Sequence, residues 1–131
     1  MNEGRKLTLL RVVMAVVGVS LLVATPIGLD LWPAGFRWMN PAPHPPYEHM
    51  IWAMFAANGI ALLMAVRDPV RNRIIIDFTI ISMALHGLVM AWDAIAYGEP
   101  MHLIGDVPAL LLLALLFFWL RPHQPDVLVR G

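Results

Sequence analysis

The sequence predicts an all-α fold, an integral membrane four-helix bundle with both termini in the cytoplasm. Of its 131 residues, 60% are hydrophobic and only 14% are charged, and the mean hydropathy is +0.71. These values lie far outside the range of ordinary soluble domains. The chain also contains four apolar runs long enough to cross a hydrocarbon core of roughly 30 Å at ~1.5 Å per residue. A chain of this length forms one transmembrane domain.

The composition excludes several classes of function. The formal net charge is zero, so no electrostatic argument favours nucleic acid as a partner. The chain has no cysteine, which excludes disulfides, thiolate metal ligands, iron–sulfur clusters and cysteine nucleophiles. The sequence also lacks the G-x-S-x-G motif, the P-loop and the dinucleotide-binding fingerprint. It therefore favours a protein that is not an enzyme.

The first predicted span covers residues 7–29, with Arg11 extending to the near interface. Basic residues before an apolar run also suit a secretory signal peptide. However, the run exceeds the about 7–15 apolar residues of such a peptide, and Val23 to Pro26 form a poor cleavage site. We therefore expect this helix to be retained. Residues 30–46 are rich in proline and tryptophan, and we expect an extended external loop lying against the lipid head groups.

The second predicted span covers residues 47–66. Pro46 suits its first turn, and Glu48 then lies where the helix dipole favours negative charge. Small residues along this span would let another helix approach closely: Ala53, Ala56, Ala57 and Gly59. Residues 67–73 follow as a short basic loop on the cytoplasmic side.

The third predicted span, residues 74–97, contains ionisable residues within an apolar helix. His86 and Asp93 are seven residues apart, which places them about 20° apart on one helix face. Such groups are costly in a membrane and normally face a partner or a cavity. A polar stripe therefore runs along this helix and consists of Thr79, Met83, His86, Met90, Asp93 and Tyr97.

The fourth apolar run, residues 101–120, has two possible beginnings. Asp106 followed by Pro108 suits a helix start, which leaves a helix of about 14 residues after irregular backbone. Otherwise the helix begins near Met101 and is kinked at Pro108. The tail that follows, residues 121–131, is polar.

The distribution of lysine and arginine predicts the orientation. With four spans, the amino terminus, loop 67–73 and the tail share one side of the membrane. That side holds eight of the nine basic residues: Arg5, Lys6, Arg11, Arg67, Arg71, Arg73, Arg121 and Arg130. Only Arg37 lies on the other side. Because cytoplasmic loops are enriched in lysine and arginine, we predict a multi-pass protein of the bacterial inner membrane with both termini inside.

Histidines and carboxylates gather in the external half of three spans, with His86 deeper, near the middle of the membrane. The candidate metal ligands are Glu48, His49, His86, Asp93, His102 and Asp106. Imidazole and carboxylate groups together suit zinc, copper or iron. No ligand spacing in the sequence demands a metal, however. Alternatively, His86 could ligate a b-type haem, although a second mid-membrane histidine is missing. A proton relay is a third possibility, but Asp77 points about 180° away from His86 on the same helix.

The leading hypothesis gives these polar residues a structural role. Inward side chains can hydrogen-bond across helices and fix the order of the bundle, and we expect His86 to pair with Glu48 or Asn58, and Asp93 with His102. The predicted seam consists of Asn58, Thr79, His86, Asp93 and Tyr97. Such a bundle suits an accessory or assembly subunit of a membrane complex. Its expected partners are the lipid bilayer and either another membrane protein or further copies of itself.

Four short motifs carry a resemblance to a known group of proteins. They are PPYEHM at the start of the second span, RDPVRNR in the loop after it, HGLVM in the third span and HLIGDVP before the fourth. Over about residues 44–120 the chain resembles a family of short bacterial four-helix membrane proteins of unknown function. The resemblance implies the architecture and no activity. It makes Glu48, His86 and Asp106 the first positions to test.

Overall fold

The computed structural model describes residues 2–39 and 45–122, and these ranges contain helices and no strand. The elements are α1 (Glu3–Leu31), α2 (Pro33–Phe36), α3 (Pro45–Ala65), α4 (Arg73–Ala96), η1 (Pro100–Leu103) and α5 (Asp106–Leu120). Four helices are long and apolar enough to cross a membrane: Glu3–Val23, Pro46–Ala65, Arg73–Ala96 and Pro100–Leu120, the last combining η1 and α5. The predicted all-α membrane fold is thereby confirmed.

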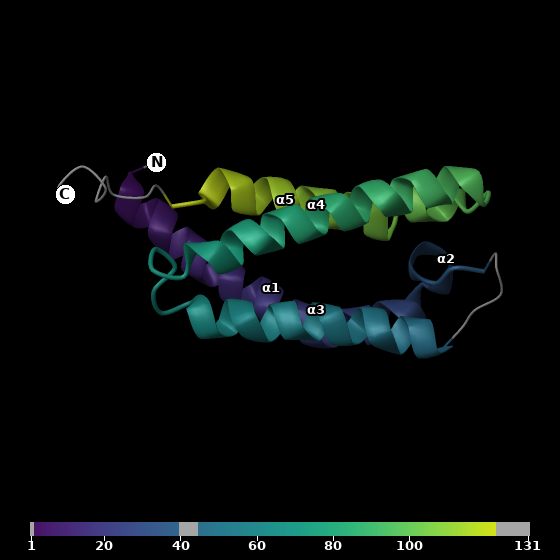
Figure 1. Ribbon diagram of the computed structural model, residues 1–131, viewed down its shortest axis with the longest axis horizontal. Coiled ribbons are helices and arrows are strands. Elements are labelled where there is room, and N and C mark those ends of the chain that lie inside the picture. Colours follow the sequence, from purple (N-terminus) through teal and green to yellow (C-terminus); the bar gives the residue numbers. More distant parts are fainter. Residues whose placement is uncertain (1, 40–44, 123–131) are drawn as a thin grey trace.

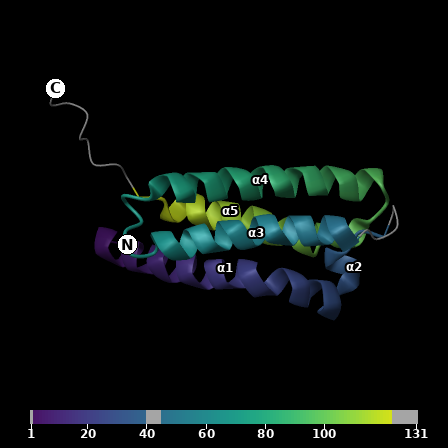
Figure 2. The same ribbon diagram turned by 60° about the horizontal axis from the view of Figure 1, so that its bottom comes forward.

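The helices form two antiparallel pairs, α1 with α3 and α4 with α5 (Figure 1). The amino terminus, the α3–α4 turn and the end of α5 lie at one end of the bundle (Figure 2). Helix α2 and η1 lie at the other end, which we call the α2 end. Helices α3 and α4 are consecutive in sequence but have few contacts with each other. The bundle is therefore held together within each pair more than between α3 and α4.

Helix α1 is longer than the predicted first span. It begins at Glu3 because the side chain of Asn2 accepts a hydrogen bond from the Arg5 backbone N–H at 2.9 Å. It continues past Pro26 to Leu31.

The sequence predicts an extended loop over residues 30–46. In the structure, however, residues 33–36 form the short helix α2. Pro33 occupies the first position of α2, where the missing N–H has no cost. Residues 40–44 of the predicted loop and residues 123–131 of the predicted tail lie outside the described residues.

Small residues bring α1 and α3 into close contact. A Cβ atom on Gly59 would lie 2.6 Å from the carbonyl oxygen of Gly18, so neither helix has room for a side chain there. This agrees with the prediction that the small residues of the second span permit close approach. Ala53 and Ala57, in contrast, lie on the exposed side of α3.

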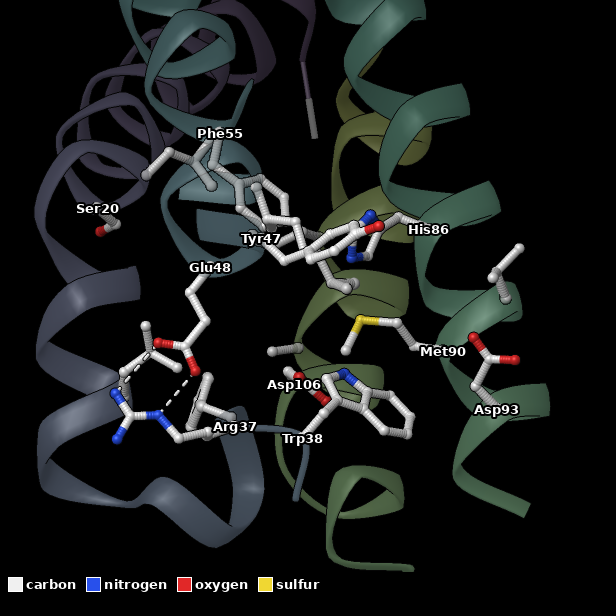
Figure 3. A pocket seen from close by; sticks show the side chains of 18 of the residues that line it. Ser20, Arg37, Trp38, Tyr47, Glu48, Phe55, His86, Met90, Asp93 and Asp106 are labelled. Atoms are coloured by element: carbon white, nitrogen blue, oxygen red, sulfur yellow. Dashed lines mark hydrogen bonds and ion pairs between the residues drawn. The ribbon is translucent and has the colours of Figure 1, made fainter. Parts of the chain in front are cut away.

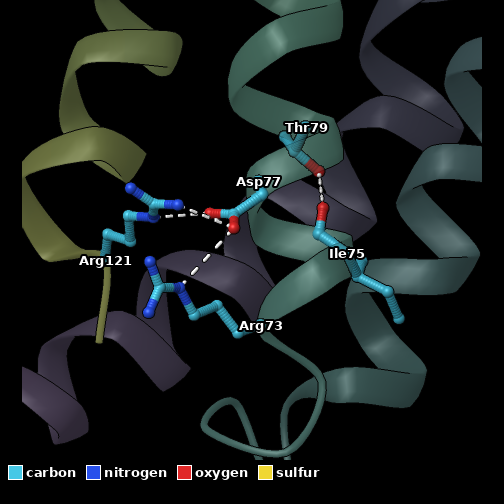
Figure 4. A network of polar contacts seen from close by, with 5 residues as sticks. All are labelled: Arg73, Ile75, Asp77, Thr79 and Arg121. Atoms are coloured by element: carbon cyan, nitrogen blue, oxygen red, sulfur yellow. Dashed lines mark hydrogen bonds and ion pairs between the residues drawn. The ribbon is translucent and has the colours of Figure 1, made fainter. Parts of the chain in front are cut away.

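The end of the bundle that carries the amino terminus has a packed core and ion pairs between helices. Its fully buried side chains include Leu10, Met14, Leu62, Ile76, Phe117 and Leu120. Arg121 donates hydrogen bonds from Nε and Nη2 to the Asp77 carboxylate at 2.6 and 2.8 Å, and Nε of Arg73 lies 3.5 Å from the same carboxylate. Figure 4 shows the side chains of both arginines pointing toward Asp77. The hydrogen bonds that Arg121 donates to Asp77 raise the pKa of the Arg121 guanidinium. This interaction ties the start of α4 to the end of α5.

Of the two possible beginnings of the fourth span, the structure shows the later one. A 3₁₀ turn, η1, precedes a 15-residue helix that begins at Asp106. Gly105 rather than Asp106 is the N-cap residue. A Cβ atom on Gly105 would collide with the carbonyl group of Gly35, so the η1–α5 junction packs directly against α2.

Candidate functional site

A cavity of about 830 Å³ lies at the α2 end, and all five α-helices or the residues flanking them contribute to its lining. Its walls are mostly apolar and include Leu21, Leu29, Ile51, Val89, Leu110 and Leu113. Polar groups are few: Ser20, Arg37, Glu48, His86, Asp93 and Asp106, with the hydroxyls of Tyr47 and Tyr97. Figure 3 shows the Arg37–Glu48 pair on the α3 side and His86 and Asp93 on the α4 side. The cavity has the size and lining typical of a small-molecule site.

Beside the cavity, His102 and Asp106 form a buried pair. Nδ1 of His102 lies 3.0 Å from each carboxylate oxygen of Asp106. The indole of Trp38 stacks on the imidazole with ring centroids 4.0 Å apart and an angle of 11° between the planes. Nε2 of His102 is buried and has no hydrogen-bond partner in the part of the chain that the structure describes. This pair fixes the η1–α5 junction against the segment after α2.

Glu48 is held by Arg37 rather than by a histidine. Arg37 Nε and Nη2 donate to the two carboxylate oxygens of Glu48 at 2.9 and 3.3 Å. The ion pair joins the first turn of α3 to the residue that follows α2. The predicted pairing of His86 with Glu48 is therefore not formed.

His86 lies half-buried on the cavity wall, at the middle of α4. Its ring centroid lies 5.3 Å from that of Phe55, with the rings tilted by 57°. Asn58, the other predicted partner of His86, instead accepts a hydrogen bond from the hydroxyl of Thr79 at 2.9 Å. The predicted seam is thus divided. Asn58 and Thr79 join α3 to α4 in the interior, while His86, Asp93 and Tyr97 line the cavity.

Asp93 is the cavity-lining carboxylate for which the described part of the chain supplies no partner side chain. Glu48 pairs with Arg37 and Asp106 pairs with His102. Among residues 2–39 and 45–122, no side chain makes a hydrogen bond or ion pair with the Asp93 carboxylate. The predicted partner of Asp93, His102, is engaged by Asp106.

The structure does not assemble the six proposed metal ligands into one site. Glu48, His86, Asp93 and Asp106 line the cavity, whereas His49 lies on the exposed side of α3. Within the described ranges, no three or more His, Asp or Glu side chains form a group that could hold a metal ion. His86 is also the one histidine among the described lining residues, so a bis-histidine haem site is not formed there.

Sequence reasoning missed three residues that shape the site: Arg37, Trp38 and Phe55. Arg37 and Trp38 were assigned to an interfacial loop, although Arg37 is the one basic residue predicted on that side. A lone cation opposite Glu48 was the available signal for their pairing. Nothing in the sequence distinguished Phe55 from the other apolar residues of the second span.

The comparisons with known proteins identify the family and no function. No curated protein matches the chain. No solved structure matches it either. One family matches residues 5–123, which is most of the chain, and is described as a family of unknown function. This protein therefore belongs to the family of unknown function DUF6632.

Proposed function

We propose that this protein is a non-catalytic accessory protein of the bacterial inner membrane that holds a small lipid-soluble molecule inside its bundle. The cavity at the α2 end carries this proposal. Its volume of about 830 Å³ suits a drug-sized ligand, its walls are apolar, and a few polar groups are placed to orient a head group. The absence of enzyme signatures in the sequence favours binding without reaction.

The route into the cavity runs between α3 and α4. These two helices contact each other little, and the lining residues Ile51 and Val89 at this side are 39% and 59% exposed. In a bilayer these positions face lipid. A lipid-soluble molecule could therefore enter from the membrane without passing through water.

Blocking this opening tests the proposal. Val89→Trp adds a large side chain at the cavity wall, whereas Leu88→Trp adds the same bulk at a neighbouring position that is 58% exposed and does not line the cavity. The wild type and the two variants are purified in mild detergent and extracted with organic solvent, and the extracts are compared by mass spectrometry. We expect one lipid-soluble compound to copurify with wild type and Leu88→Trp and to fall about tenfold in Val89→Trp, a loss of about 1.4 kcal/mol in binding. Equal recovery from the two variants would refute the cavity as its site.

We also propose that the α2 end faces the periplasm, with both termini in the cytoplasm. Support comes from the basic residues, eight of which lie in or near the cytoplasmic segments. A reporter that is active only in the periplasm, fused after Gly131, should be inactive, and the same reporter inserted between Ala42 and Pro43 should be active. The reverse pattern would overturn the orientation and place the cavity at the cytoplasmic side.

A further inference from the structure

We propose that the molecule held in the cavity is a lipophilic cation, such as an amine or quaternary ammonium compound with aromatic or aliphatic groups. This inference rests on the proposed binding function and names its ligand class. Two observations on the lining of the cavity lead to it: the partner of each charged side chain and the aromatic rings.

Of the three carboxylates that line the cavity, Asp93 is the one for which the described residues supply no partner. Arg37 and Glu48 neutralise each other at 2.9 Å. Asp106 is paired with His102 at 3.0 Å. Asp93 has no side-chain partner within residues 2–39 and 45–122. A bound cation would supply the missing partner, because an ionised group within a membrane-spanning helix is costly unless it is paired.

The charged residues that line the cavity also argue against an anionic ligand. Arg37 is the one lysine or arginine among the described lining residues, and its guanidinium is already engaged by Glu48. An anion would have to displace Glu48 and would also meet the charge of Asp93. Asp93 therefore attracts a cationic ligand and repels an anionic one.

Aromatic rings supply the second recognition element. The lining includes Phe36, Trp38, Tyr47, Phe55 and Tyr97. The faces of such rings attract cations, and the attraction is strongest where water is excluded. The apolar walls would accommodate the hydrophobic substituents of the cation. A carboxylate among aromatic rings in an apolar chamber thus matches a molecule that is both cationic and oily.

The test uses two probes of nearly equal size and shape and opposite charge, tetraphenylphosphonium and tetraphenylborate. Binding to the full-length protein in neutral detergent is measured by calorimetry at several salt concentrations. Wild type should bind tetraphenylphosphonium at least about tenfold more tightly than tetraphenylborate, since a partly buried charge pair exceeds the 1.4 kcal/mol that this ratio requires. Equal or tighter binding of tetraphenylborate would overturn the inference.

A matched pair of variants locates the effect. Asp93→Asn keeps the shape of the side chain and should weaken tetraphenylphosphonium binding about tenfold. Asp30→Asn removes the same charge at the exposed end of α1, outside the cavity lining, and should leave binding unchanged. Unchanged binding by Asp93→Asn, or an equal loss in both variants, would refute the role of Asp93. If a neutral compound still copurifies in a Val89-dependent manner while neither probe binds, the cationic ligand is excluded and the proposed binding function stands.

Discussion

Two carboxylates of α4, one toward each end of the bundle, have different surroundings. At the end near the amino terminus, Asp77 is met by both Arg121 and Arg73, and the neighbouring core is filled by fully buried side chains. At the α2 end, Asp93 on the same helix has no side-chain partner in the described ranges and faces a cavity. Helix α4 thus carries two carboxylates with different surroundings. Asp77 binds Arg121 at the end of α5, and Asp93 lines the cavity. Glu48 and Asp106 also line the cavity but are paired, so Asp93 is the lining carboxylate for which the described residues supply no partner.

The position of the cavity is related to where α3 and α4 contact each other. At the packed end, residues from α1, α3, α4 and α5 share one hydrophobic cluster. Toward the middle, the Thr79–Asn58 hydrogen bond still joins α4 to α3. Beyond it, side chains of α3 such as Glu48 turn to Arg37 instead of to α4. The cavity therefore lies on the α2 side of the Thr79–Asn58 hydrogen bond.

The largest predicted effect compares one phenylalanine from each end. Phe117 is fully buried in the packed core, and Phe117→Ala should lower the free energy of unfolding by about 3–5 kcal/mol. Phe55 is half-buried beside the cavity, and Phe55→Ala should cost less than about half as much, because fewer packed atoms surround it. Unfolding in mixed micelles, followed by circular dichroism, measures both. Equal costs would show that the α2 end is packed as tightly as the other.

A smaller effect is expected at the boundary between the two regions. Thr79→Val removes the hydroxyl that donates to Asn58 while keeping the volume of the side chain. It should cost about 0.6 kcal/mol, the average for hydrogen bonds between membrane helices. Thr8→Val is the matched control, because Thr8 is exposed and its hydroxyl bonds only to the Gly4 carbonyl of its own helix. A cost no larger than that of the control would mean that this hydrogen bond does not hold the pairs together.

The spans and the polar stripe could be predicted from the sequence, because length, hydropathy and helical periodicity are local properties. The repeat of Thr79, His86 and Asp93 along one face of α4 needed no knowledge of other helices. The four long helices follow from apolar runs of sufficient length. Even the start of α5 at Asp106 was among the two beginnings that the sequence allowed.

The partners of these polar residues could not be predicted, because they depend on which helices pack together. The expectation that His86 meets Glu48 or Asn58 assumed that consecutive spans pack closely along their whole length. In the structure α3 packs against α1 and α4 against α5, so Glu48 turns to Arg37 and His86 faces a cavity. The stacking of Trp38 on His102 could not be predicted for the same reason, because the two residues are distant in sequence and meet only through packing.

The contact between Gly35 and Gly105 makes α2 and the start of α5 one mechanical unit. No side chain separates the two backbones, and the stacked rings of Trp38 and His102 clamp the same junction from a second direction. The paired side chains of His102 and Asp106 also join η1 to the first turn of α5. Arg37, which follows α2, donates a hydrogen bond to Glu48 on α3. The segment from α2 to Trp38 thus contacts residues from two sides of the cavity, Glu48 on α3 and His102 beside Asp106.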